Sequence, residues 1–257
     1  MKKIIYSLLA ILLLNACSRD AVYPELRNTV IGEVIVRNEF GTRIPDQTGV
    51  TVTLDVTDFS AMTDENGVFE ITDVLRGNYR VRFQKEGYND YFVDIEVRET
   101  GPTNFNATDQ GSDFNFVAPS TLGFDTFDFV ENTSSIDFDV EFSEVITETD
   151  PGMVVFVSSS EDVSNTSYER SYSYRDFDND GDIDNSDGNR LFLSNLRSAF
   201  GDEATVYLVA YPASTSPTSH SYIDTTTGLN IYYPLNNQPS EVFTLDLTED
   251  DSDIIRQ

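Results

Sequence analysis

Alternation of apolar and polar residues, broken at short intervals by turn residues, decides the fold class of this chain. Residues 136–142 (IDFDVEF) alternate without a break, and residues 50–56 and 91–98 follow the same two-residue period. Such a period buries one face of a β-strand and leaves the other face in water. Glycine, proline, asparagine and aspartate recur between these segments, as expected of turns. The sequence therefore predicts an all-β chain.

The strand-like segments form two groups, which predict two tandem β-sandwich domains. We place the first domain at residues 29–98 and the second at residues 114–247, joined by a polar linker at residues 99–113. In the second domain, the unbroken apolar run 153–157 predicts a central strand. Residues 248–257 are acidic, and we expect them to form a frayed tail.

Residues 1–16 have the composition of a cleaved secretory signal peptide. Lys2 and Lys3 precede an apolar stretch, residues 4–14, that is too short to span a bilayer. We therefore exclude residues 1–16 from the fold.

The residues after the apolar stretch, Leu14-Asn15-Ala16-Cys17, resemble a bacterial lipobox. The resemblance implies cleavage before Cys17, lipidation of Cys17, and residues 17–28 as a tether to the membrane. Cys17 is the chain's one cysteine, so an intramolecular disulfide is impossible. In enteric bacteria an aspartate after the lipidated cysteine favours the inner membrane, so Ser18 favours the outer membrane.

The charge of the chain limits its partners. Removing Lys2 and Lys3 with the signal peptide changes the formal charge from −29 to −31. Such a charge excludes nucleic acid, whose phosphates would be repelled, and it opposes flat docking on anionic lipid. The remaining partners are the membrane, through the lipid anchor, and an envelope protein or a polysaccharide.

The first domain carries a series of turn motifs: Gly32-Glu33-Val34, residues 63–69 (TDENGVF), residues 75–81 (LRGNYRV) and Lys85-Glu86-Gly87-Tyr88. Their order and turn residues resemble the carboxypeptidase regulatory-like domain. The resemblance implies a transthyretin-like sandwich that serves as an accessory module and has no catalytic residues. Its Asn66-Gly67 pair predicts a tight hairpin, because such turns need positive φ angles. Two roles stay open, a rigid spacer and a binding surface.

Residues 191–211 of the second domain place Leu196 and a turn before a strand-like Tyr207-Leu208-Val209-Ala210 segment. This order resembles the end of a fibronectin type III-like sandwich. The spacing from the leucine to the tyrosine is longer than is usual in that family. An immunoglobulin-like sandwich is therefore the broader prediction.

One acidic segment, residues 176–187, has the ligand spacing of a calcium loop. Such loops take oxygen ligands from positions 1, 3, 5, 7, 9 and 12, with glycine at position 6, which is Gly181 here. The segment resembles the loops of EF-hands, dockerins and thrombospondin type 3 repeats, with aspartate in place of the usual glutamate at position 12. A structural Ca²⁺ is predicted, since the carboxylates would otherwise repel one another; the alternative is a solvated acidic loop. The predicted ligands are Asp176, Asp178, Asp180, Asp182, Asp184 and Asp187.

Three tyrosines, Tyr168, Tyr172 and Tyr174, precede this loop in an alternating segment. They offer a possible ligand surface, since tyrosine can replace the absent tryptophan as a platform for sugars. The alternative, which we favour, is the half-covered face of a strand.

Catalytic machinery is sparse. His220 is the one histidine, and its Ser/Thr-rich surroundings, residues 214–220, predict a surface loop. One histidine and a lipidated cysteine exclude a zinc site of the usual type, and nothing near His220 suggests a serine triad. We therefore predict a non-catalytic lipoprotein that binds or scaffolds at the cell envelope. The alternatives are a glycan-binding accessory of a polysaccharide uptake system and a hydrolase.

Overall fold

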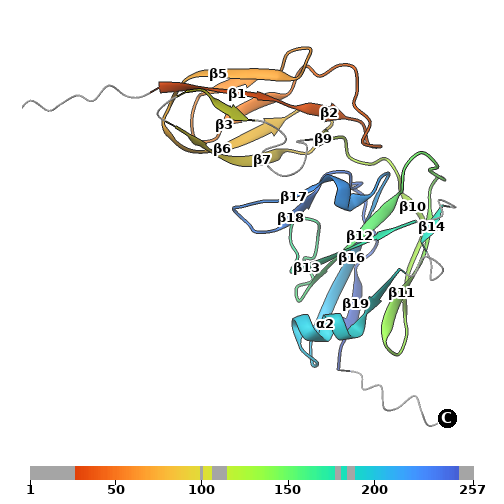
Figure 1. Ribbon diagram of the computed structural model, residues 1–257. Coiled ribbons are helices and arrows are strands. Elements are labelled where there is room, and N and C mark those ends of the chain that lie inside the picture. Colours follow the sequence, from red (N-terminus) through yellow and green to blue (C-terminus); the bar gives the residue numbers. More distant parts are fainter. Residues whose placement is uncertain (1–26, 99–100, 106–114, 177–180, 184–188, 249–257) are drawn as a thin grey trace, which may run out of the picture.

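The computed structural model describes residues 27–98, 101–105, 115–176, 181–183 and 189–248. In these parts the chain forms two β-sandwich domains, which follow one another in Figure 1. The predicted signal peptide, Cys17, and residues 249–257 of the predicted tail lie outside the described residues. No helix of the described parts is long and apolar enough to cross a bilayer.

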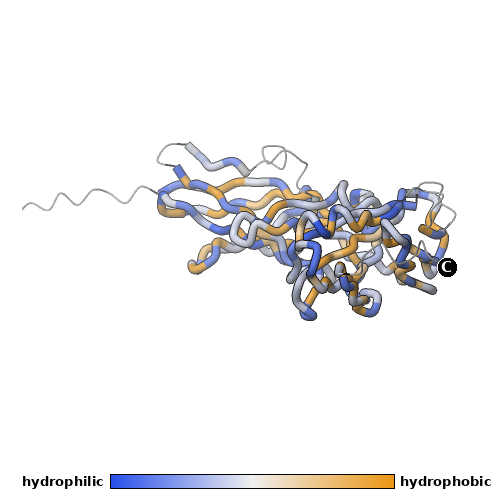
Figure 2. Tube along the Cα trace, turned by 90° about the horizontal axis from the view of Figure 1, so that it is seen from below, coloured by the Kyte–Doolittle hydropathy of each residue, from blue (hydrophilic) through white to orange (hydrophobic). Residues whose placement is uncertain are grey.

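The first domain packs two sheets against each other. Their strand orders are β4-β3-β6-β7 and β5-β1-β8. The strands are β1 Arg27–Glu33, β3 Thr51–Leu54, β4 Ser60–Met62, β5 Val68–Leu75, β6 Gly77–Gln84, β7 Tyr91–Val97 and β8 Thr103–Phe105. Inward side chains such as Val52, Phe69 and Phe83 form one buried cluster between the sheets. Figure 2 shows apolar and polar residues alternating along these strands, as the sequence predicted.

The first domain extends beyond the predicted boundary at residue 98. Strand β8, inside the predicted linker, pairs in parallel with β1. Strand β9 (Asn115–Val117), predicted to begin the second domain, pairs in parallel with β2 (Ile35–Arg37), and Phe116 is buried in the first domain's core. The polar composition of residues 99–113 predicted a linker. A short edge strand needs only a few buried side chains, so the composition of such a segment does not reveal it.

The second domain is also a sandwich. One sheet contains β10 and β11 with β14 and β15, and the other has the order β13-β12-β16-β19. The strands are β10 Phe124–Glu131, β11 Ser135–Phe142, β12 Gly152–Ser158, β13 Arg170–Arg175, β14 Asp182–Ile183, β15 Arg190–Phe192, β16 Thr205–Ala213 and β19 Phe243–Asp246. As predicted, residues 136–142 form a half-buried strand and residues 153–157 lie in a central strand.

The sheet around β12 is buried on both faces. Met153, Val155 and Val157 point into the sandwich core, whereas Val154 and Phe156 belong to a second cluster on the opposite face. This second cluster explains why the run is apolar without a break. The sequence predicted a turn after Leu196. The structure instead has a helix there, α2 (Leu193–Phe200), which buries Leu193 and Leu196.

Between β16 and β19 the chain leaves the second sandwich, and we call residues 214–235 the arm. It contains a 3₁₀ turn, η3 (Pro217–His220), and a hairpin of β17 (Ser221–Ile223) and β18 (Asn230–Tyr232). In Figure 1 the hairpin lies beside the first domain. The arm is the feature that joins the two domains.

Candidate functional site

Three tyrosines form the apolar part of the joint between the domains. The Tyr222 ring centroid lies 4.3 Å from that of Tyr91, and Tyr233 lies 5.2 Å from Tyr91 and 5.3 Å from Tyr222. Tyr91 comes from β7, whereas the other two come from the arm, and Tyr233 is buried in the first domain's core. Burial raises the pKa of the Tyr222 hydroxyl to about 12. The arm therefore completes the core of the first domain.

Polar contacts hold the arm on the outer face of β6 and β7. Nη2 of Arg80 donates to both carboxylate oxygens of Asp224, at 3.0 and 2.9 Å. Thr225 donates to Asp94, and Arg80 also contacts Thr226. Burial acts to raise the pKa of Asp224, but hydrogen bonds from Arg80 and the Thr226 backbone outweigh it and lower that pKa. The carboxylate is thus held charged against Arg80.

A second polar contact ties the turn after β2 to the second domain. Glu39 accepts hydrogen bonds from the Thr121 backbone at 2.6 Å and from the Ser214 hydroxyl at 2.8 Å. Ser214 also shares a 2.6 Å hydrogen bond with Ser120. Together with the tyrosines and Arg80, this contact fixes the two domains to each other from two sides.

His220 lies in this joint and is partly buried, so the prediction of a surface loop is wrong. A Cβ atom built on Gly41 would lie 2.7 Å from His220 Nε2, and His220 Nδ1 is buried without a hydrogen-bond partner in the described parts of the structure. Burial and the nearby Arg37 lower the pKa of His220. No hydrogen bond joins it to a described serine hydroxyl, so the described residues assemble no serine triad.

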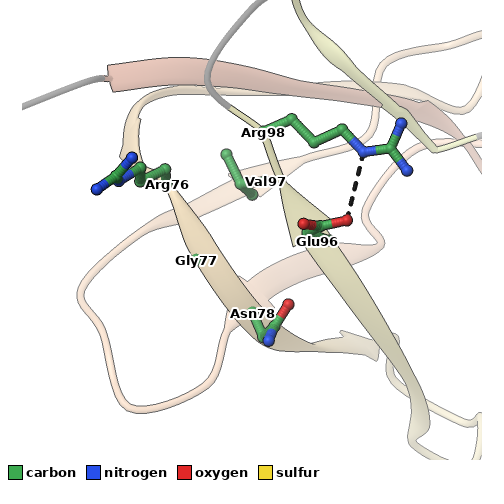
Figure 3. Close-up of a pocket in the computed structure, with 6 residues that line it drawn as sticks. All are labelled: Arg76, Gly77, Asn78, Glu96, Val97 and Arg98. Atoms are coloured by element: carbon green, nitrogen blue, oxygen red, sulfur yellow. Dashed lines mark hydrogen bonds and ion pairs between the residues drawn. The ribbon is translucent and has the colours of Figure 1, made fainter.

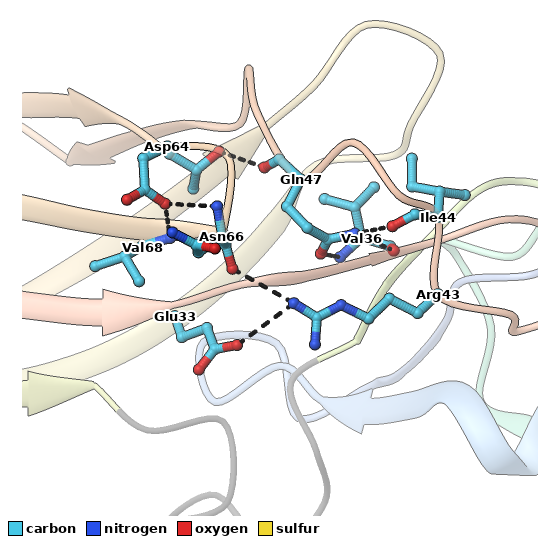
Figure 4. Close-up of polar contacts among 9 residues, drawn as sticks. Glu33, Val36, Arg43, Ile44, Gln47, Asp64, Asn66 and Val68 are labelled. Atoms are coloured by element: carbon cyan, nitrogen blue, oxygen red, sulfur yellow. Dashed lines mark hydrogen bonds and ion pairs between the residues drawn. The ribbon is translucent and has the colours of Figure 1, made fainter.

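The turn motifs of the first domain act as structural supports (Figure 4). The buried Gln47 amide accepts a hydrogen bond from the Val36 backbone at 2.7 Å and donates to the Val36 carbonyl at 3.1 Å, as a strand partner would. Asp64 accepts from the Val68 and Asn66 backbones at 2.9 and 2.8 Å, and these bonds lower its pKa. Both side chains satisfy backbone groups, which is a folding role.

One open pocket lies where β6 begins and β7 ends (Figure 3). Two arginines, Arg76 and Arg98, line it, and Arg98 pairs with Glu96 at 3.3 Å across an exposed surface. Exposed ion pairs hold little energy. Gly77, Asn78 and Val97 complete the lining of this pocket.

The base of the predicted calcium loop is built at the edge of the second sandwich. Asp176 is fully buried, its backbone N–H donates to the Pro151 carbonyl at 3.1 Å, and its carboxylate accepts from the Gly181 backbone at 3.0 Å. At the other end Asn189 donates to the Arg175 carbonyl at 2.6 Å. Ile183 is fully buried in the sandwich core. The two ends of the loop are therefore held together.

The described residues contain only part of the predicted ligand set. Asp176 and Asp182 are described, whereas Asp178, Asp180, Asp184 and Asp187 lie outside the described residues. Within the described stretches, no three His, Cys, Asp or Glu side chains gather as a metal site. A buried carboxylate at the first ligand position fits the oxygen donors that Ca²⁺ requires.

The three tyrosines before this loop do not share one surface. Tyr174 is buried in the sandwich core beside Phe138, and Tyr172 packs partly against the same core. Tyr168 packs against the cluster on the opposite face of the sheet, and its hydroxyl donates to the Asn230 carbonyl at 2.7 Å. The combined ligand surface is therefore excluded, and Tyr172 and Tyr174 line the face of a strand.

Comparisons with solved structures find several proteins to which parts of the chain are similar. It is 33% identical to a type II cohesin-X-dockerin complex chain from Acetivibrio cellulolyticus, over 30% of this chain and 51% of that one, with a TM-score of 0.26. It is 10% identical to a DUF3823 family protein from Parabacteroides merdae, over 86% and 98% of the chains, with a TM-score of 0.32. For the FN1-FN3 domains of chicken CNTN1 the identity is 10%, over 78% and 56%, with a TM-score of 0.28.

The chain spans about half the length of the first solved chains that it matches. No curated protein matches it. A family model does match part of the sequence, and that part contains the turn motifs centred on Asp64 and Gly67. Residues 33–109 match the model of the carboxypeptidase regulatory-like domain, which confirms the family that the turn motifs resemble.

Proposed function

We propose that the protein is a non-catalytic binding or scaffolding module of the bacterial cell envelope. A lipid on Cys17 anchors it to the outer membrane, and the second domain meets an envelope protein or a polysaccharide. The first domain serves as the spacer between the anchor and that second domain.

The domain joint is the observation that carries this proposal. Tyr222 and Tyr233 complete the core of the first domain, and Arg80 holds Asp224 of the arm. Figure 1 shows that β1 begins at the end of the first domain that faces away from the second domain. A chain held at its N-terminal end would therefore carry the second domain outward on a fixed spacer.

Replacing Cys17 with alanine tests the anchor. We expect the natural protein in the membrane fraction of the producing cells and the Cys17→Ala variant in the soluble fraction, because several acyl chains are needed for firm attachment. The measurement is an immunoblot of the separated fractions, with Ser18→Ala as the control that keeps the cysteine. A Cys17→Ala protein that stays with the membranes would remove the anchor from the proposal.

We further propose that Ca²⁺ binds the loop of residues 176–187 and stabilises the second domain. Support comes from the buried Asp176 carboxylate and from the contacts that close the loop base, Asn189 to Arg175 and Gly181 to Phe142. Asp176, Asp178 and Asp180 would supply carboxylate oxygens, and Asp182 its carbonyl. The ion would cancel the repulsion between these carboxylates, and it takes no part in a reaction.

Thermal unfolding of residues 18–257 with Ca²⁺ or with a chelator tests this site. At a hundred times the dissociation constant, binding to the folded state alone adds about 2.7 kcal/mol, which raises the Tm of a domain of this size by about 5–10 °C. We expect that rise for the natural chain and for an Asp125→Ala control on β10, but not for Asp180→Ala. Equal Tm values with Ca²⁺ and with chelator would contradict the site and identify the loop as a solvated acidic segment.

A further inference from the structure

The one histidine of the chain stands where the two domains meet. His220 ends η3 in the arm, and its Nε2 faces Gly41, which belongs to the turn after β2 of the first domain. The His220 carbonyl accepts a hydrogen bond from the Tyr233 backbone at 3.1 Å, and Tyr233 is packed against Tyr91. The backbone of His220 is therefore tied to the tyrosines that close the joint.

The surroundings of His220 suit a neutral imidazole. Its Nδ1 is buried, and the described residues offer that atom no acceptor. Arg37, whose positive charge acts on His220, donates to the Gly41 carbonyl at 2.8 Å on the same turn. Adding a proton to His220 would place a second positive charge beside Arg37 and leave a buried N–H without a partner. Both effects cost free energy.

The other charged and titratable groups of the joint offer His220 no compensation. Glu39, in the same turn as Gly41, has its carboxylate oxygens occupied by Thr121 and Ser214. The arm brings Tyr222, whose raised pKa leaves its hydroxyl uncharged near neutral pH, and Asp224, which pairs with Arg80. The carboxylates of Glu39 and Asp224 thus already accept hydrogen bonds from other donors.

We infer that His220 makes the domain joint sensitive to pH, so that protonation of its imidazole loosens the arm from the first domain. In the open joint His220 would meet water and recover its ordinary pKa of about 6.5. In the closed joint its pKa is lowered. The closed joint therefore binds fewer protons than the open joint. The full stability of the closed joint is present above about pH 6.5, and it is lost as the pH falls from that value toward the pKa of His220 in the closed joint. Each unit of pKa depression corresponds to a tenfold change in the ratio of open to closed joint.

The first measurement is an NMR titration of residues 18–257, where a single histidine gives a single imidazole signal. We expect an apparent pKa below 6.5 in the natural chain. A Tyr222→Ala variant, which removes the ring that packs against Tyr91, should move the pKa of His220 back toward 6.5, because coupling between two events is reciprocal. A pKa of 6.5 or above in the natural chain would overturn the inference.

The second measurement is the radius of gyration by small-angle X-ray scattering from pH 8 to pH 5. We expect the natural chain to expand as the pH falls, and a His220→Gln variant, which cannot take up the proton, to keep its radius of gyration. The variant also controls for carboxylates that titrate near pH 5. Equal expansion of both proteins, or expansion of neither, would contradict a switch at His220.

Discussion

Replacing Gly67 with alanine should destabilise the first domain more than any other glycine-to-alanine change in its turns. Gly67 has a φ of +88°, a left-handed conformation that costs other residues about 1–2 kcal/mol. A Cβ atom there would also collide with the Val34 carbonyl oxygen. The Val34 backbone cannot retreat freely, because its N–H donates to the Gly67 carbonyl at 2.9 Å. Backbone strain and overpacking together predict that the free energy of unfolding falls by roughly 3–5 kcal/mol.

Gly87 provides the matched control for this prediction. Its φ of +81° is similar, but nothing lies within 4 Å of the position where a Cβ atom would stand. Gly87→Ala should therefore cost only the conformational part, about 1–2 kcal/mol. Urea unfolding of both variants measures the difference in the free energy of unfolding. Similar losses in the two variants would mean that the contact with Val34 relaxes without cost.

The turn around Gly67 shows what a local sequence pattern can predict. An Asn-Gly pair between strand-like segments marks a turn, and the structure has a turn there with Gly67 at positive φ. The predicted hairpin is wrong, because the strands on either side, β4 and β5, pair in different sheets. The alternating segments were equally informative, because a two-residue period fits a half-buried strand and little else. The turn and the alternating strands depend on neighbours in sequence, and the structure has them where they were expected.

The domain joint could not be predicted in the same way. Arg80 and Asp224 are 144 residues apart, and neither lies in a motif that distinguishes it from other surface charges. The polar residues Ser214, Thr215 and Ser216 have the composition of an exposed loop, yet they are buried because the arm folds back between the domains. Only the packing of distant segments decides such burial, and a single sequence does not reveal it.

Replacing Phe156 with alanine should give the second large loss of stability. Phe156 is fully buried, but it points away from the sandwich core, into the cluster on the other face of its sheet. Its ring centroid lies 4.7 Å from Tyr168, 5.5 Å from Tyr211 and 5.8 Å from Tyr232. Truncating a buried phenylalanine usually costs about 3–5 kcal/mol. Phe192, which is 47% exposed, supplies a control whose replacement by alanine should cost less than about 1 kcal/mol.

The Phe156→Ala variant also tests whether this outer cluster supports the arm. Tyr232 belongs to β18, and its hydroxyl shares a 2.9 Å hydrogen bond with Ser171 of β13. Emptying the space beside Tyr232 should loosen β18, and with it the adjacent Tyr233 that packs on Tyr91 of the first domain. Amide hydrogen exchange should then rise in residues 221–233 as well as in β12. If exchange rises in β12 alone, the arm is held by the first domain's contacts with Tyr222 and Asp224, and the outer cluster stabilises the second sandwich only.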